Sequence, residues 1–190
     1  MRTFIAIELP QEIKDSLERL QAGLKQTGAD VKWVNPENIH LTLKFLGEVD
    51  EGKIKDIEQT LEGVALNYKQ FSIRPFSIGV FPKMEFPKVI WIGIDKGDNE
   101  TKLIAGELEQ NLAQIGMPKE DRPFSSHITI GRTKSFLNRN NLIRELKNLE
   151  GKIEGKFREF PVTRLTLLKS TLTPKGPTYE ILKEVSLTTT

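Results

Sequence analysis

A repeat with a spacing of 87 residues runs through this 190-residue chain. The chain has two histidines, His40 and His127, and each begins the pattern His-x-Thr-apolar. The apolar segment around Trp91 also resembles the segment around Phe4, at the same spacing of 87 residues. Because this period is far longer than that of a solenoid repeat, we interpret the chain as two copies of one globular unit.

Hydrophobic periodicity predicts a similar order of helices and strands in the two copies. Apolar residues at three- and four-residue steps predict helices over residues 10–26, 50–66, 99–115 and 138–149. Short apolar or alternating runs predict strands over residues 2–8, 31–34, 40–46, 70–81, 88–95, 125–132, 153–160, 162–173 and 178–187. The order indicates a duplicated α+β fold. We expect one domain, residues 1–190, made of two related halves at about 1–87 and 88–175, with the C-terminal strand pairing back.

Composition excludes several functional classes. The chain has no cysteine, which excludes disulfides, thiolate nucleophiles and cysteine-ligated metal centres. A net charge of +2 does not indicate nonspecific DNA binding, although it permits a local basic cleft for a phosphate-bearing ligand. No apolar run approaches the roughly 18 residues of a membrane helix. The first residues meet an acid and a proline too soon for a secretory signal, so we expect a cytoplasmic protein without a membrane partner.

The spacing within each motif places its two polar side chains on one face of a strand. His40 and Thr42 are therefore expected to project together, as are His127 and Thr129. If the two halves pack about a pseudo-twofold axis, both imidazoles face one central cleft.

Two opposed imidazoles suit the opening of a phosphodiester. This reaction needs a base for the attacking oxygen and an acid for the departing oxygen, and the two lie on opposite sides of phosphorus in an in-line displacement. Histidine, with a pKa near ~6.5, can fill either role around neutral pH. The threonine hydroxyls can donate hydrogen bonds to the non-bridging oxygens. This chemistry requires no metal and no cofactor.

Simpler interpretations exist for each motif taken alone. A single histidine in a strand is more often structural than catalytic, and threonine is a common strand residue. Histidine is also the commonest metal ligand, but two histidines without an adjacent carboxylate make a poor metal site. The matched pair favours catalysis, because a structural role gives no reason for the repeated spacing.

The segments that surround the motifs resemble the signatures of the two-histidine phosphoesterases. They read HLTLKFLG at residues 40–47 and PFSSHITIGR at residues 123–132, and the segment FIAIELP at residues 4–10 fits as well. Over essentially its whole length the chain is similar to the LigT-like branch, the RNA 2′,3′-cyclic phosphodiesterases also known as 2′-5′ RNA ligases. The resemblance implies two lobes, each an antiparallel sheet backed by outer helices, with a cleft between them.

The resemblance implies metal-free hydrolysis of RNA 2′,3′-cyclic phosphate ends to 2′-phosphates, with tRNA halves as one candidate substrate, and reversible 2′-5′ joining of RNA ends. By family analogy His40 is the general acid for the leaving 3′ oxygen and His127 is the base that activates water. The two similar halves do not by themselves order these roles. Alternatives are a phosphodiesterase for small cyclic or 2′-5′-linked nucleotides, and a nucleotide- or RNA-binding module without turnover. We expect a monomer, because a duplicated chain needs no partner to build its cleft.

The resemblance also implies that Arg132, after the second signature, contacts phosphate. Strict alternation from His127 points Arg132 to the opposite face, so this role requires a bulge or twist at Gly131. Phe45 holds the corresponding place in the first half, where a core position is favoured over stacking on a base. Further cations are candidates for an RNA-binding rim, although a solvated surface position is favoured for each of them: Lys44, Arg74, Lys83 and Lys134.

Overall fold

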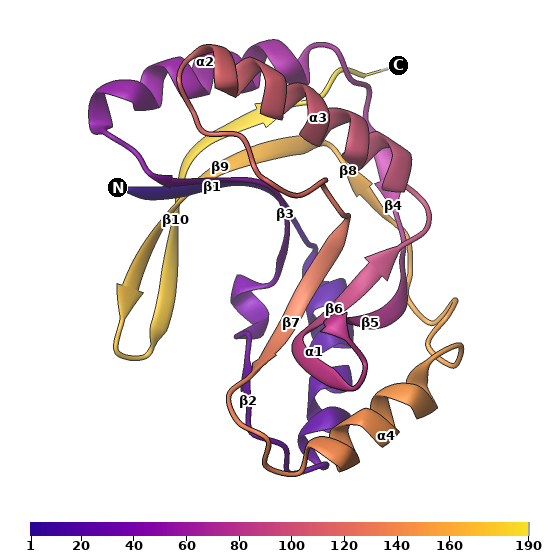
Figure 1. Cartoon of the computed structure of the whole chain (residues 1–190). Helices are drawn as coiled ribbons and strands as arrows, with labels where there is room; N and C mark the ends of the chain where they lie inside the picture. The colour runs from indigo at the N-terminus through magenta and orange to yellow at the C-terminus, as the bar shows by residue number, and fades with distance from the viewer. Residues whose placement is uncertain (190) are drawn as a thin grey trace.

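The computed structural model describes residues 1–189, which form strands and helices in a mixed order (Figure 1). The strands are β1 (Arg2–Glu8), β2 (Val31–Trp33), β3 (His40–Glu48), β4 (Phe71–Ile73), β5 (Pro75–Lys83), β6 (Phe86–Ile94), β7 (His127–Thr133), β8 (Phe160–Val162), β9 (Arg164–Thr173) and β10 (Gly176–Ser186). The α-helices are α1 (Gln11–Lys25), α2 (Ile54–Ala65), α3 (Asp98–Gln114) and α4 (Arg139–Leu149). Short 3-10 helices lie at Pro36–Asn38 and Glu51–Lys53.

Two four-stranded sheets form the framework, and their paired strands are antiparallel. The first sheet has the order β10-β9-β1-β3 and the second has the order β2-β7-β6-β5, while β4 and β8 form a separate pair. This arrangement confirms the predicted α+β class with two antiparallel sheets. Each sheet takes two strands from the N-terminal part of the chain and two from the C-terminal part. We therefore propose that the two related halves, about 1–87 and 88–175, build the sheets by exchanging strands.

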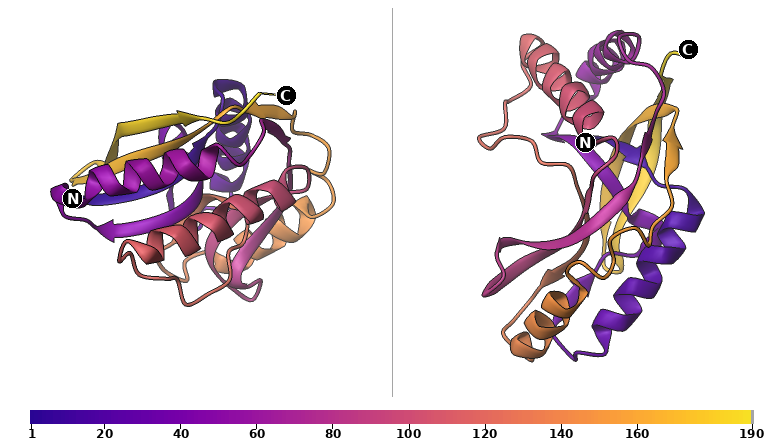
Figure 2. Two further views of the ribbon diagram at one scale, coloured as in Figure 1. Left: turned by 90° about the horizontal axis from the view of Figure 1, so that it is seen from above. Right: turned by 90° about the vertical axis from the view of Figure 1, so that its right-hand side faces the viewer.

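The helices cover the outer faces of the sheets in two pairs (Figures 1 and 2). Helices α2 and α3 pack together, with contacts from α3 to β3 and from α2 to β9 and β10. Helices α1 and α4 contact each other, and in Figure 1 α1 runs behind the second sheet while α4 lies at the bottom of the molecule. Gln21 of α1 donates a hydrogen bond to the Ile130 carbonyl of β7, at 2.9 Å. Most buried side chains of both sheets and all four helices belong to one continuous core, so the lobes are not independent units; Phe4, Ala6 and Leu168 form a small separate cluster. None of the helices within residues 1–189 has the length and apolarity needed to cross a membrane.

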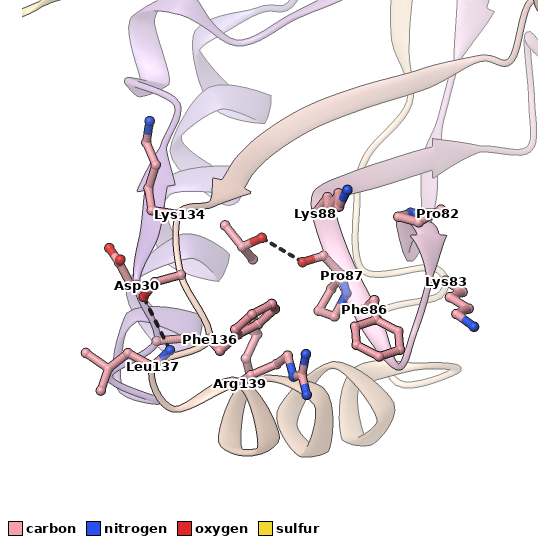
Figure 3. Close-up of a pocket in the computed structure, with 14 residues that line it drawn as sticks. Asp30, Pro82, Lys83, Phe86, Pro87, Lys88, Lys134, Phe136, Leu137 and Arg139 are labelled. Carbon is pink, nitrogen blue, oxygen red and sulfur yellow. Dashed lines mark hydrogen bonds between the residues drawn. The ribbon is translucent and has the colours of Figure 1, made fainter.

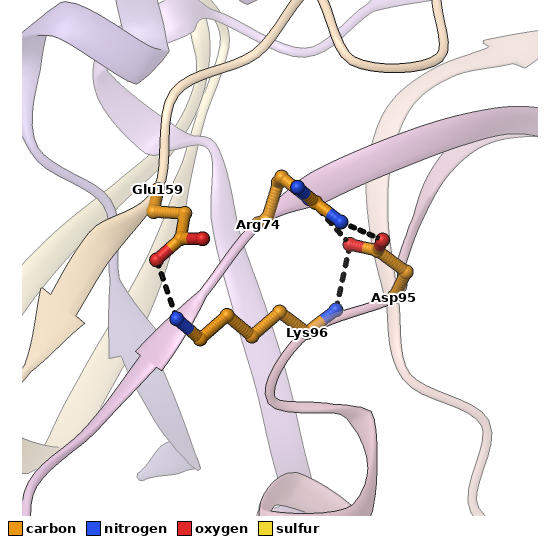
Figure 4. A network of polar contacts seen from close by, with 4 residues as sticks. All are labelled: Arg74, Asp95, Lys96 and Glu159. Atoms are coloured by element: carbon orange, nitrogen blue, oxygen red, sulfur yellow. Dashed lines mark hydrogen bonds and ion pairs between the residues drawn. The ribbon is translucent and has the colours of Figure 1, made fainter.

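The segment 70–81, expected as one strand, is interrupted at Arg74 (Figure 4). The interruption allows β4 to pair with β8 while β5 pairs with β6. The Arg74 guanidinium forms an ion pair with Asp95 just after β6, and its hydrogen bond lowers the pKa of that carboxyl. Next to it, the Lys96 ammonium lies 2.7 Å from a carboxylate oxygen of Glu159. Arg74 thus joins strands at this junction and is not among the residues that line the cleft described below.

The predicted strand over residues 153–160 is wrong, because only Phe160 from that range lies in a strand. The apolar residues that favoured a strand, Ile153 and Phe157, are instead buried by a compact series of turns. Gly151 and Gly155 have φ angles of 73° and 74°, which residues with side chains rarely adopt. These glycines let the chain turn repeatedly while it places two apolar side chains in the core.

Candidate active site

Both histidines stand at the first position of a strand, His40 in β3 and His127 in β7. They line one cavity of about 580 Å³ between the two sheets, together with Thr42 and Thr129. In both strands the residues between and after these positions are buried in the opposite layer. The structure therefore brings the four side chains of the two motifs to a single cleft, as the spacing predicts.

Each imidazole makes the same hydrogen bond with the segment just before its strand. Nδ1 of His40 lies 2.7 Å from the carbonyl oxygen of Asn38, and Nδ1 of His127 lies 2.8 Å from that of Ser125. A carbonyl oxygen only accepts, so Nδ1 carries the hydrogen in both rings. The other ring nitrogen, Nε2, is then free to accept a proton when the ring is neutral and to donate one when it is charged. Two rings are held in the same tautomer by equivalent contacts.

A β-bulge lies at the same place in both histidine strands. In β3 the pairing with β1 skips Leu43, and in β7 the pairing with β6 skips Ile130, which is the equivalent position of the second copy. The extra residue reverses the alternation beyond it. Arg132 consequently faces the cleft with His127, and the bulge that its proposed role required is present.

The bulge in β3 has the corresponding effect, which overturns two expectations. Phe45 is 55% exposed and lines the cleft, so the favoured core position is wrong. Lys44 points to the core side and is only 2% exposed, so a solvated position is wrong for it. Its ammonium lies 2.6 Å from a Glu109 carboxylate oxygen and donates to the Pro118 carbonyl at 2.9 Å. Lys44 thereby anchors the loop that leads to His127.

Gly131 occupies the position in β7 that corresponds to Lys44. A Cβ atom there would lie 2.9 Å from side-chain atoms of both Trp33 and Val31 of the neighbouring β2. Only glycine permits this close approach between β2 and the bulge, which brings the segment after Trp33 to the cleft. The two copies thus share the bulge, but the residue on its core side is a glycine in β7 and a buried lysine in β3.

The cleft is strongly basic although the chain is nearly neutral. Four cations contribute to its lining, and these are Arg2, Lys32, Arg132 and Lys175. None of its lining residues within the described part of the chain is Asp or Glu. In residues 1–189 there is also no cluster of three His, Asp or Glu side chains that could hold a metal ion. A cleft of this charge favours an anion such as a phosphodiester.

The two imidazoles lie in different surroundings. The ring of His40 stacks on Phe4 with centroids 4.7 Å apart and meets Tyr179 edge-on at 5.4 Å. Burial lowers the pKa of His40 to about 4, against a smaller opposing effect of its hydrogen bond to the Asn38 carbonyl. Burial also raises the pKa of Tyr179. His40 is therefore neutral near pH 7 in the free protein.

The ring of His127 has a different aromatic wall. It meets Phe81 edge-on at a centroid distance of 5.2 Å and Trp91 at 6.5 Å. These aromatic neighbours of the two histidines were not identified from the sequence as site residues. A periodic apolar pattern places Phe4 and Trp91 on strands, but it does not show that they adjoin a histidine from another strand.

The burial of His40 predicts a pH dependence of stability. Between pH ~4 and ~6.5 the unfolded chain binds more protons at this histidine than the folded protein does, so the unfolding free energy rises with pH across this window. The shift in pKa corresponds to a loss of at most about 3 kcal/mol at the acidic end. Denaturant unfolding at a series of pH values measures this. His40→Gln is expected to make the rise with pH shallower, because only carboxyl groups such as Asp95 then contribute, and His127→Gln is expected to retain the full rise; equal slopes in the two variants would contradict the assignment to His40.

Comparisons with known proteins agree with this geometry. The family described as LigT like Phosphoesterase matches the chain twice, at residues 7–91 and 92–179. The protein named RNA 2′,3′-cyclic phosphodiesterase of Methanocaldococcus jannaschii is 39% identical over 184 residues, covering 97% of this chain and 99% of that protein. The protein of the same name from Methanothermobacter thermautotrophicus is 36% identical over 182 residues, covering 94% of this chain and 95% of that protein.

Solved structures show the same architecture. The protein TT0787 of Thermus thermophilus superimposes with a TM-score of 0.80 at 28% identity, and 98% of each chain is covered. E. coli LigT, in a structure described as a complex with 3′-AMP, gives a TM-score of 0.79 at 26% identity, again with 98% of each chain covered. The double match of the family, the full-length relatives and the shared architecture lead to one conclusion: this chain belongs to the LigT-like phosphoesterases.

Proposed function

We propose that this protein is an enzyme that hydrolyses the 2′,3′-cyclic phosphate at RNA ends and leaves a 2′-phosphate and a free 3′-hydroxyl. The observation that carries the proposal is the pair of imidazoles, each with Nε2 free, in one basic cleft. The full-length relatives that are named for this activity support it.

In the proposed mechanism the cyclic phosphate binds between the two histidines, with its charge balanced by Arg132 and Lys32. A water oxygen attacks phosphorus in line with the bond to the 3′ oxygen. One imidazole takes a proton from the water through Nε2, and the other donates its Nε2 proton to the departing 3′ oxygen. Thr42 and Thr129 donate hydrogen bonds to the non-bridging oxygens. A ribose hydroxyl in place of water gives 2′-5′ joining by the same steps.

We assign the acid role to His40 and the base role to His127, as the family resemblance implies. The low pKa of His40 in the free protein opposes this assignment, because an acid must be protonated when the reaction begins. The bound phosphodiester supplies a negative charge beside Nε2, and in a partly desolvated site such a charge raises the pKa of an imidazole. In this proposal His40 becomes an acid only when the substrate is bound.

The chain itself supplies both imidazoles, so we propose that it acts as a monomer. RNA fragments with cyclic ends, such as tRNA halves, are the proposed substrates. The four cations of the cleft lining favour an RNA chain, which carries further phosphates, over a single small nucleotide.

Hydrolysis of an oligoribonucleotide with a 2′,3′-cyclic phosphate end, measured with EDTA present, tests the function. The wild-type protein is expected to produce a 2′-phosphate end. His40→Ala and His127→Ala are each expected to lower kcat by about 10²- to 10⁴-fold, because each removes one proton transfer. Thr60→Ala, on α2 and away from the cleft lining, serves as the control. A fully active variant of either histidine, or RNA binding without turnover by the wild type, would contradict the proposal.

An activated substrate tests the order of the roles. A nitrophenyl phosphodiester has a leaving group that departs without protonation, so loss of the acid hardly matters while loss of the base still does. His40→Ala is expected to hydrolyse this substrate within about tenfold of the wild-type rate, whereas His127→Ala is expected to lose activity on both substrates. The reverse pattern would exchange the roles and leave the two-histidine proposal in place.

A further inference from the structure

A second cavity, of about 550 Å³, lies between the β5–β6 hairpin and the beginning of α4 (Figure 3). It shares no lining residue with the catalytic cleft. The mechanism above makes no use of it, and its residues include both exposed aromatic rings and a cluster of cations.

Two exposed phenylalanines lie on either side of one arginine. The guanidinium carbon of Arg139 is 4.8 Å from the ring centroid of Phe86 and 4.7 Å from that of Phe136 (Figure 3). Phe136 is 76% exposed and Phe86 is 46% exposed. Lys83 also lies over Phe86, at 5.3 Å. Exposed rings stacked with cations are the surfaces on which single-stranded nucleic acids place their bases.

The charge around these rings is mainly positive. Lys83, Lys88, Lys134 and Arg139 line the cavity, and Asp30 is the one acidic residue in its lining within residues 1–189. None of these four cations has an ion-pair partner among the carboxylates of the described chain. Four uncompensated cations around aromatic rings are complementary to a phosphate backbone with its bases.

The second cavity lies just beyond the catalytic cleft along β7, on the helix-covered face of the sheet. Arg132 of β7 lines the catalytic cleft, and the next two residues, Thr133 and Lys134, line the second cavity. Val89 of β6 pairs with Arg132, and the residue before it, Lys88, also lines the second cavity. From Thr129 to Lys134 the extended chain covers at most about 16 Å. A few nucleotides of extended RNA span that length.

We propose that this cavity binds the RNA segment on the 5′ side of the terminal cyclic phosphate. Bases stack on Phe136 and Phe86, and backbone phosphates lie near Lys83 and Lys134. The inference rests on the proposed function, since the cleft fixes the position of the terminal nucleotide. It specifies the substrate as a single-stranded RNA several nucleotides long. The short distance along β7 from the cleft of the proposed function favours RNA over an acidic peptide as the occupant.

The test compares a nucleoside 2′,3′-cyclic monophosphate with a hexaribonucleotide that carries the same end. The wild-type protein is expected to have a lower KM for the hexamer. In the double variant Phe86→Leu/Phe136→Leu, KM for the hexamer is expected to rise by about 5- to 100-fold, because stacking is lost while the apolar volume remains. Its kcat/KM for the mononucleotide is expected to stay within twofold of wild type, which also shows that the variant is folded.

The salt dependence of binding tests the role of the cations. Each of the two double variants has a matched control. In Lys83→Gln/Lys134→Gln, the salt dependence of hexamer binding is expected to weaken by a slope of about one, since up to two phosphate contacts are lost. Controls are Leu66→Ala/Leu103→Ala and Lys55→Gln/Lys69→Gln, which change exposed side chains away from both cavities. Kd values for a hexamer that ends in a 2′-phosphate, from fluorescence anisotropy, provide the binding data independently of turnover.

The outcomes separate the two proposals. The inference would be overturned if the wild-type KM were equal for hexamer and mononucleotide. It would also be overturned if the phenylalanine substitutions changed the Kd of the hexamer no more than the control substitutions do. In either case, hydrolysis of the mononucleotide would still uphold the proposed function. Failure to hydrolyse either cyclic phosphate would overturn the proposed function. The anisotropy measurements would still decide whether the second cavity binds RNA.

Discussion

One hydrogen bond in each half, from Nδ1 of a histidine to the carbonyl oxygen two residues earlier, determines what the cleft can do. It directs Nε2 of His40 and His127 into a common space and sets the same tautomer in both rings. A β-bulge three residues after each histidine turns a further side chain to the cleft, Phe45 in β3 and Arg132 in β7. Each copy of the strand therefore brings a histidine and a second side chain to the cleft, and in the proposed function the two histidines transfer the protons.

The two halves hold their histidines by the same hydrogen bond, but the side chains around the two rings differ. Phe4 and Tyr179 withdraw His40 from water, which makes its protonation depend on a nearby anion. Positive charge is concentrated in the cleft where the proposed substrate would bind, although the chain carries a net charge of only +2. Arg132 of β7 lines the catalytic cleft, and Lys134, just after the end of that strand, lines a second basic surface. The arrangement is consistent with a substrate that extends beyond its reacting phosphate.

Local periodicity in the sequence correctly predicts most helices and strands. It also predicts that the two His-x-Thr motifs lie in one cleft. What it missed depends on partners far along the chain. Gly131 signalled one bulge, but nothing in the first motif signalled the other, so Lys44 and Phe45 were assigned to the wrong sides. Lys44 is buried because Glu109 and Pro118 receive its ammonium. The break at Arg74 likewise follows from the pairing of β4 with β8.

The central claim is that two imidazoles act on opposite sides of one phosphorus atom. A crystal structure with a nucleoside 2′,3′-vanadate, which mimics the five-coordinate phosphorus of an in-line displacement, tests it most directly. Nε2 of His40 and Nε2 of His127 are expected within about 3 Å of the two axial oxygens, one on each side of the vanadium. A vanadate that contacts one histidine alone, or that binds outside the cleft, would contradict the account.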